Sequence, residues 1–217
     1  MNTKTKHFYG VIPMQPENGL YSVVYDCKEN SKLDNKLETF FPGLVAINGY
    51  VEKGEHIKIS AIKVSDHDNS EMNYQKFLGE LNKISSEKGF TYDLEIIKTS
   101  EDLAIKKNLS LFKKLIKSVG NDEELYASIN YGFKPTPIIL SMALNYAYQI
   151  CENTDIGCIL YGQFNHVTKK STIYDTTALF YMDGIVNTLA KNKVKDSSKM
   201  MDFVLGEEYD DDDDEIN

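Results

Sequence analysis

Runs with the residue pattern of buried strands alternate with runs that have the pattern of helices along most of this chain. His56–Val64 and Thr91–Thr99 are rich in β-branched and aromatic residues, and each is followed by a longer stretch whose apolar residues recur at helical spacing. Strands that alternate with helices pair side by side in a parallel sheet, because each helix carries the chain back to the start of the next strand. The alternation therefore predicts an α/β fold.

The expected strands are short apolar runs bounded by glycine, proline or polar clusters, namely His7–Met14, His56–Val64, Thr91–Thr99, Leu125–Asn130, Ile156–Gly162 and Ser171–Asp175. The expected helices have apolar residues at three- and four-residue steps, namely Pro42–Val51, Asn69–Gly89, Ser100–Val119, Thr136–Cys151 and Thr177–Ala190. A further run, Leu20–Cys27, either forms a hairpin with the first strand or lies beside the sheet as an insertion. We expect a Rossmann-like, doubly wound, mostly parallel sheet with helices on both faces and an antiparallel edge hairpin ending at Ser171–Asp175.

The length of the chain, and the point at which the alternation of strands and helices stops, predict its domain organisation. A chain of 217 residues with 41% hydrophobic residues is long enough for one well-buried core, which we assign to residues 1–195. After Lys195 the pattern stops, and the run Asp210–Asp214 repels itself and stays solvated. We expect residues 196–217 to be an acidic, disordered tail. Two roles remain open for it: a solubilising segment, or a peptide that docks on a protein partner.

The charged residues exclude several functions. A formal charge of -9 and a pI near 5.0 argue against binding of duplex nucleic acid, since such binding draws on many clustered cations. All 24 basic residues are lysine. Bidentate phosphate contacts by arginine and arginine fingers are therefore excluded from this chain. An anionic ligand must meet a local cationic spot.

The spacing of the cysteines and histidines, and the first residues of the chain, predict an intracellular protein without a metal centre. The cysteines Cys27, Cys151 and Cys158 are few and widely spaced, as in a reduced, cytoplasmic protein. No apolar stretch approaches the roughly 20 residues of a membrane span, and the first residues lack the pattern of a signal peptide. The histidines form no metal-spaced set. Glycine fingerprints for ATP or dinucleotides do not occur, so we expect no cofactor.

The stretch Asn130–Pro137, with the sequence NYGFKPTP, joins an expected strand to an expected helix. Gly132 allows the backbone to approach a ligand, Lys134 supplies a cation, and Thr136 can cap the helix or donate to a phosphate. In open α/β sheets, such a loop lies at the carboxyl end of a strand, where helix amides face anionic ligands. The alternative is an ordinary connection with a proline in the first helical turn.

The segments LYASINYGFKPTPIILSMALNYAY, IGCILYGQ and STIYDTTALFYMDGIVNTLA resemble the CARF domain, the CRISPR-associated Rossmann-like sensor of cyclic oligoadenylates, in its short form without an effector domain. The resemblance covers residues 125–190 best. It implies a homodimer that binds a cyclic oligoadenylate second messenger, with cyclic tetra-adenylate the expected ring, in type III CRISPR antiviral defence. Gly132, Phe133, Lys134 and Thr136 match the family's binding loop.

Other positions follow the resemblance less closely. Ser128 and Asn130 stand where the family has Asp and Thr. Tyr131, like Phe133, either stacks on adenine or packs in the core. The family also uses the loop after the first strand, which brings in Met14 and Gln15 by geometry alone. We expect ligand contacts from these two residues, from Asn130 and Tyr131, from the matching positions, and from Gln163.

A second polar loop, Gln163–Lys170, follows the next strand and contains His166. Some family members cleave their own ligand when a ribose 2'-hydroxyl attacks the adjacent phosphate, a reaction that needs positioning and a cation. Lys134 and His166 are the candidates for such a ring nuclease, and the alternative interpretation of His166, which the sequence favours, is a solvated hairpin tip. A third possibility is a scaffold without a nucleotide ligand that acts through the acidic tail.

Overall fold

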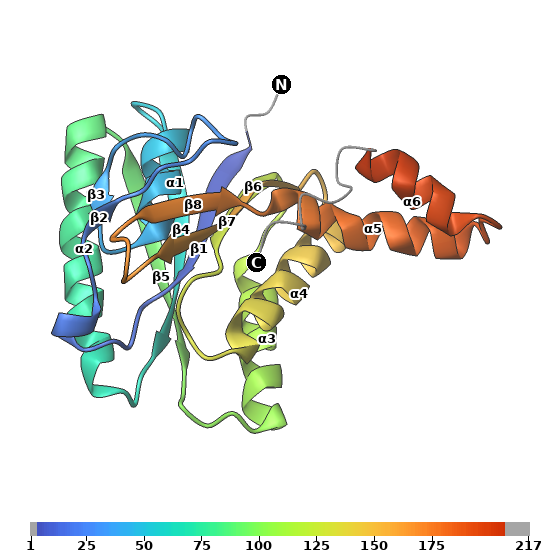
Figure 1. Cartoon of the computed structure of the whole chain (residues 1–217). Helices are drawn as coiled ribbons and strands as arrows, with labels where there is room; N and C mark the ends of the chain where they lie inside the picture. Colours follow the sequence, from blue (N-terminus) through green and yellow to red (C-terminus); the bar gives the residue numbers. More distant parts are fainter. Residues whose placement is uncertain (1–3, 207–217) are drawn as a thin grey trace. The chain divides into compact units, whose positions relative to one another are not determined.

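The computed structural model describes residues 4–206, and a six-stranded sheet runs through its first part (Figure 1). The strands follow the order β5-β4-β1-β6-β7-β8 across the sheet. Their bounds are β1 Thr5–Val11, β4 His56–Val64, β5 Thr91–Thr99, β6 Glu123–Ser128, β7 Asp155–Phe164 and β8 Ser171–Asp175. All neighbouring pairs are parallel except β7 and β8, which form an antiparallel hairpin at one edge. The predicted α/β fold with a mostly parallel sheet is confirmed.

Four helices cover the two faces of this sheet. Helices α1 (Pro42–Tyr50) and α2 (Asp68–Lys88) contact each other on one face, and α3 (Ile105–Ser118) and α4 (Pro135–Ile150) pack together on the other (Figure 1). Alternate side chains of β1 face the helix layers on opposite sides of the sheet. Phe8 belongs to the core beneath α1 and α2, whereas the Tyr9 hydroxyl reaches α3. Both faces are therefore buried, as the apolar strand patterns indicate.

The segment between β1 and α1 is an insertion beside the sheet, so the alternative of a hairpin with β1 is wrong. It contains a short 3-10 helix, Glu17–Gly19, and a separate antiparallel pair formed by β2 (Val23–Val24) and β3 (Glu38–Thr39). Asp26 then forms an isolated bridge with Thr172 in β8. The insertion is thereby tied to the antiparallel edge of the main sheet.

Helix α3 begins later than the sequence predicts. We expected it to start at Ser100 with acidic residues in its first turn, but the helix begins at Ile105 and has none there. The acidic groups instead hold the preceding turn: Asp102 Oδ1 accepts a hydrogen bond from the Ala104 amide at 2.9 Å, and Asp66 accepts from the Glu101 amide at 3.1 Å. These bonds satisfy amides that a helix would otherwise leave unpaired.

The chain divides into two compact units between Ala178 and Leu179. Helix α5 (Thr177–Lys191) runs across this boundary, and α6 (Ser197–Leu205) follows. The start of the expected tail is therefore helical, because the Asp196 side chain accepts a hydrogen bond from the Lys199 amide and caps α6. The acidic run Asp210–Asp214 lies outside the described residues.

The helices within residues 4–206 were also compared with the dimensions of a bilayer. None of them combines the length and the apolar character that crossing a membrane requires.

Candidate functional site

The central strand β1 marks the point where the chain changes direction across the sheet. From β1 the chain adds β4 and then β5 on one side, and it later adds β6 and then β7 on the other. The loops after β1 and after β6 therefore leave neighbouring strands at the same edge and lead to opposite faces. In open α/β sheets, this switch point is where ligands bind.

The loop after β1 is held by side chains of α2. Asn73 Nδ2 donates to the backbone oxygens of Pro13 and Gln15 at 2.8 and 2.9 Å, and Asn69 Nδ2 donates to that of Met14 at 3.1 Å. The Gln15 side chain is exposed at this edge, and Met14 is half-buried. The loop thus has a fixed backbone from which these two candidates project.

Asn130 connects the loop after β6 to the next strand. Its Oδ1 accepts a hydrogen bond from the Gly162 amide at 2.7 Å, and its Nδ2 donates to the Gly162 oxygen at 2.5 Å. Ser128 Oγ adds a bond of 3.2 Å to the same Oδ1. Only 7% of Asn130 is exposed. Both ends of its amide are therefore used inside the protein, and its role in the geometry is to shape the loop.

Tyr131 and Gly132 turn the chain sharply, with φ angles of 65° and 76°. The Tyr131 hydroxyl donates to the Phe40 oxygen at 2.8 Å, and burial raises the pKa of this hydroxyl far above its ordinary range. A Cβ atom on Gly132 would lie 3.1 Å from Thr136 Cβ and 3.2 Å from Val11 Cγ1. The loop after β6 therefore lies directly against the end of β1, and Gly132 permits this approach.

Lys134 stands immediately before the first residue of α4, and its side chain is exposed. Thr136 in the first turn is buried, and its amide donates to the Phe133 oxygen at 2.8 Å. A cation beside a helix amino terminus is unfavourable in isolation, because the helix dipole is positive there. An anion bound at this position would interact favourably with both the ammonium group and the helix amides.

Gln163 and His166 lie on the hairpin that joins β7 to β8. Gln163 follows Gly162, the partner of Asn130, and its Oε1 accepts a 3.2 Å hydrogen bond from Tyr174. His166 packs edge-on against Tyr21 and Phe164, with ring centroids 5.4 and 5.0 Å apart. Gln163 is thus near the loop after β6, whereas His166 belongs to a separate aromatic cluster.

An apolar cavity near this edge is small. A cavity of about 30 Å³ lies beside the carboxyl half of β1, where Gly10 has no atom within 4 Å of the position of a Cβ. Ser128 and Tyr131 contribute to its wall, as does the start of α1 at Pro42. This volume accommodates a water molecule and not a nucleobase. A nucleotide would therefore lie along the outer edge of the loops.

The hydrogen bonds from the two asparagines on α2 to the loop after β1 could not be predicted from the sequence, because the helix and the loop lie far apart along the chain. A polar residue that is fully buried on the core-facing side of a helix is the signal that distinguishes Asn73. Burial raises the pKa of Cys158 to about 12, and the part of the chain between residues 4 and 206 has no cluster of His, Cys, Asp and Glu suited to a metal ion.

Comparison of the chain with protein-family models and with curated protein sequences gives no match.

Proposed function

We propose that this protein binds a cyclic oligoadenylate, with cyclic tetra-adenylate the expected ring, across a homodimer in type III CRISPR antiviral signalling. The observation that carries the proposal is that two loops leave neighbouring strands, β1 and β6, at the switch point of the sheet. One is the loop after β1 with Met14 and Gln15, and the other contains Gly132 and Lys134. The resemblance of residues 125–190 to the CARF domain supplies the class of ligand.

The positive groups at the start of α4 are suited to a ring of phosphates, although the net charge of the chain is negative. Lys134 is exposed, and α4 begins directly behind it. One exposed helix terminus contributes about 0.3–1 kcal/mol toward an anion, which is too little for a polyanion. In a symmetric dimer the same cation and the same helix terminus occur twice around the axis. This doubling would favour the binding of a cyclic ligand on that axis.

An apolar stripe on α4 supports the dimer. The helix contains no charged residue, and Ile138, Met142, Tyr146 and Ile150 follow one another at four-residue steps with exposed fractions of 64%, 55%, 38% and 63%. An exposed apolar stripe of this kind is typical of an interaction surface. A two-fold contact near the Ile138 end of the stripe would bring two copies of Lys134 to the same axis.

Titration calorimetry with cyclic rings of three to six adenylates tests the proposal. We expect one ring to bind per dimer, and we expect Lys134→Ala to weaken its affinity at least severalfold because the substitution removes two cations from the site. Lys113→Ala is the matched control, since Lys113 is an exposed lysine on α3. Absence of heat with every ring would refute the ligand class.

The same samples distinguish a sensor from a ring nuclease. Chromatography after long incubation reveals linear products if the ring is cut. His166, one of the two candidates for that reaction, packs among Tyr21 and Phe164. If linear products form and persist in His166→Ala but are lost in Lys134→Ala, cleavage depends on the switch-point loop alone.

A further inference from the structure

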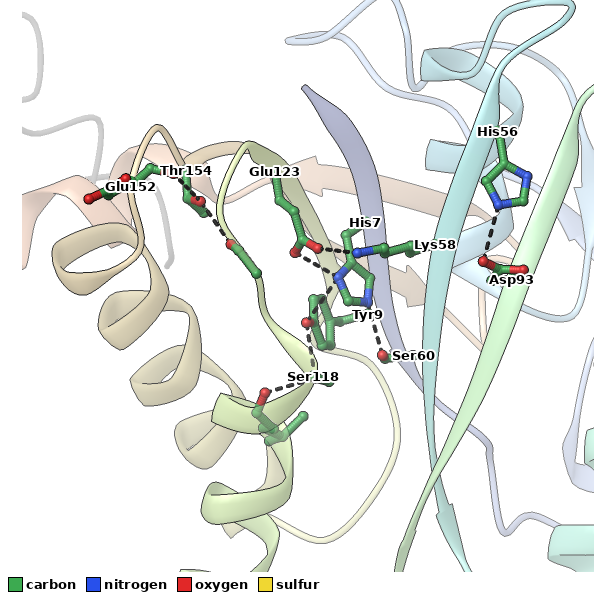
Figure 2. A network of polar contacts seen from close by, with 12 residues as sticks. His7, Tyr9, His56, Lys58, Ser60, Asp93, Ser118, Glu123, Glu152 and Thr154 are labelled. Atoms are coloured by element: carbon green, nitrogen blue, oxygen red, sulfur yellow. Dashed lines mark hydrogen bonds and ion pairs between the residues drawn. The ribbon is translucent and has the colours of Figure 1, made fainter. Parts of the chain in front are cut away.

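Three neighbouring strands contribute a buried chain of polar side chains that the nucleotide proposal does not use. His7 of β1 lies between Ser60 of β4 and Glu123 of β6 (Figure 2). His7 Nε2 is 2.9 Å from Ser60 Oγ, and His7 Nδ1 is 2.9 Å from Glu123 Oε2. The exposed fractions of His7, Ser60 and Glu123 are 2%, 0% and 1%. A hydroxyl, an imidazole and a carboxylate are thus aligned in the order of a catalytic triad.

Hydrogen-bond directions fix the proton on one imidazole nitrogen. The Ser118 hydroxyl donates to the Leu115 oxygen at 2.7 Å, so its oxygen accepts from the Tyr9 hydroxyl at 3.1 Å. Tyr9 has then used its own proton, and its oxygen must accept at the 3.2 Å contact with His7 Nδ1. Nδ1 of His7 therefore carries the proton, which it shares with Glu123 (Figure 2).

The remaining nitrogen faces the serine. In the neutral imidazole, Nε2 of His7 has a free electron pair and accepts the hydrogen bond of the Ser60 hydroxyl. Glu123 also receives a hydrogen bond from Lys58 Nζ at 2.8 Å. Burial alone would raise the pKa of Glu123, but the hydrogen bonds from His7 and Lys58 outweigh it and lower the pKa to about 2. The carboxylate stays ionised and orients the ring.

A cavity of about 300 Å³ opens beside this chain of side chains. Its volume is at the lower limit for sites that bind small molecules. The residues around it include His7 and Ser60 together with four charged residues, namely Lys58, Lys117, Asp93 and Glu95. Lys58 is already paired with Glu123, so Lys117 is the cation of the lining available to a negative charge that develops on a substrate.

We propose that Ser60 is a nucleophile, that His7 is its general base, and that together they hydrolyse a small carboxylic ester admitted through this cavity. Ser60 Oγ would attack the ester carbonyl while His7 Nε2 takes the hydroxyl proton. The alcohol leaves with that proton, and the acyl group remains on Ser60. A water molecule then attacks the acyl group, His7 takes its proton and returns it to Ser60 Oγ, and the carboxylic acid is released. Glu123 acts as a positioning residue.

A purely structural role explains the arrangement less well. Well-packed apolar residues usually stabilise a core as much as a buried charged network does. The network also lies apart from the switch-point loops, because Glu123 is the first residue of β6 and His7 pairs with the early part of β4. The hydrolytic site and the nucleotide proposal are therefore independent of each other.

Labelling of the full chain with a fluorophosphonate probe tests the proposal, with the modified residue located by mass spectrometry. Since Ser60 has no exposed surface, a reagent in the cavity reaches it only when the side chains around it move, and we expect slow labelling. Ser60→Ala should abolish the label, and Ser110→Ala, which changes an exposed serine of α3, should not affect it. No label at Ser60 in the wild-type protein after prolonged incubation overturns the proposal, whatever the variants do.

Two further variants separate catalysis from folding. His7→Gln should reduce the labelling rate about 100-fold or more, as loss of a general base does. Glu123→Gln should reduce it while Glu123→Asp restores part of the rate, because only the carboxylate fixes the imidazole tautomer. Near-ultraviolet circular dichroism confirms that each variant is folded. A folded His7→Gln variant that is labelled at the wild-type rate would show that His7 does not activate Ser60.

Discussion

At the scale of single residues, Asn130 joins the loop after β6 to β7. Its amide binds the amide and the oxygen of Gly162 in two hydrogen bonds, in a position where little water reaches it. Replacement by alanine leaves both backbone groups of Gly162 without these partners. Unsatisfied buried groups of this kind cost about 1–3 kcal/mol each.

We therefore expect Asn130→Ala to lower the free energy of unfolding by about 2–4 kcal/mol, measured by urea denaturation. Thr168→Ala, on the exposed β7–β8 turn, is the control and should change stability little. A loss below about 0.5 kcal/mol for Asn130→Ala would show that water replaces the amide and that the residue is available to a ligand.

Glu123 predicts a dependence of stability on acid pH. Its pKa is about 2 in the folded protein against an ordinary value of 4.5. Because the folded-state value is the lower one, its contribution is present above pH 4.5 and disappears as the pH falls toward 2. This lowering of the pKa of Glu123 corresponds to a contribution of at most about 3 kcal/mol to the free energy of unfolding. Urea denaturation at a series of pH values should show wild-type stability falling in this window more steeply than that of Glu123→Gln, and parallel curves would contradict the assignment.

At the scale of elements, the turn between β6 and α4 depends on Gly132. A side chain there would have a positive φ and would crowd both Thr136 and Val11. We expect Gly132→Ala to reduce stability by about 1–2 kcal/mol and to weaken ring binding, because the loop must move away from β1. Gly79→Ala is the control: Gly79 lies on the exposed side of α2 with free space around it, and alanine should add about 0.5–1 kcal/mol.

Local patterns were sufficient for most elements. The bounds of β4, β5 and β8 match the prediction, since each strand has an apolar run ended by polar or glycine residues. The start of α3 could not be predicted, because one of the side chains that hold the preceding turn, Asp66, comes from another loop. The place of the insertion after β1 depends likewise on pairing between Asp26 and Thr172, far apart in the sequence.

The two candidate sites also differ in how far they could be predicted from the sequence. The loop with Gly132 and Lys134 has a local signature, so its position between a strand and a helix could be predicted. The alignment of His7, Ser60 and Glu123 has none, because each residue comes from a different strand and only the register of the sheet brings them together. The sequence pattern of a single segment cannot reveal contacts that depend on the register between neighbouring strands.

At the scale of the whole molecule, the proposed dimerisation through α4 can be tested. Met142 is more than half exposed in the middle of the apolar stripe, and a carboxylate there would be buried without a partner in a two-fold contact. We expect Met142→Glu to yield monomers in sedimentation equilibrium and to lose ring affinity with little change in unfolding. Ser110→Glu on α3 is the control and should leave the oligomeric state unchanged. A monomeric wild-type protein would contradict the dimer.

The position of β1 in the middle of the sheet has a consequence for synthesis of the chain. Both of its neighbours, β4 and β6, are made after it, and β6 follows only once three helices and two more strands of the sheet have emerged. Until then an apolar strand has an open edge that can pair with other chains. The sheet can therefore close around β1 only after β6 has been made, and a ligand that binds at the switch point would stabilise only the finished sheet.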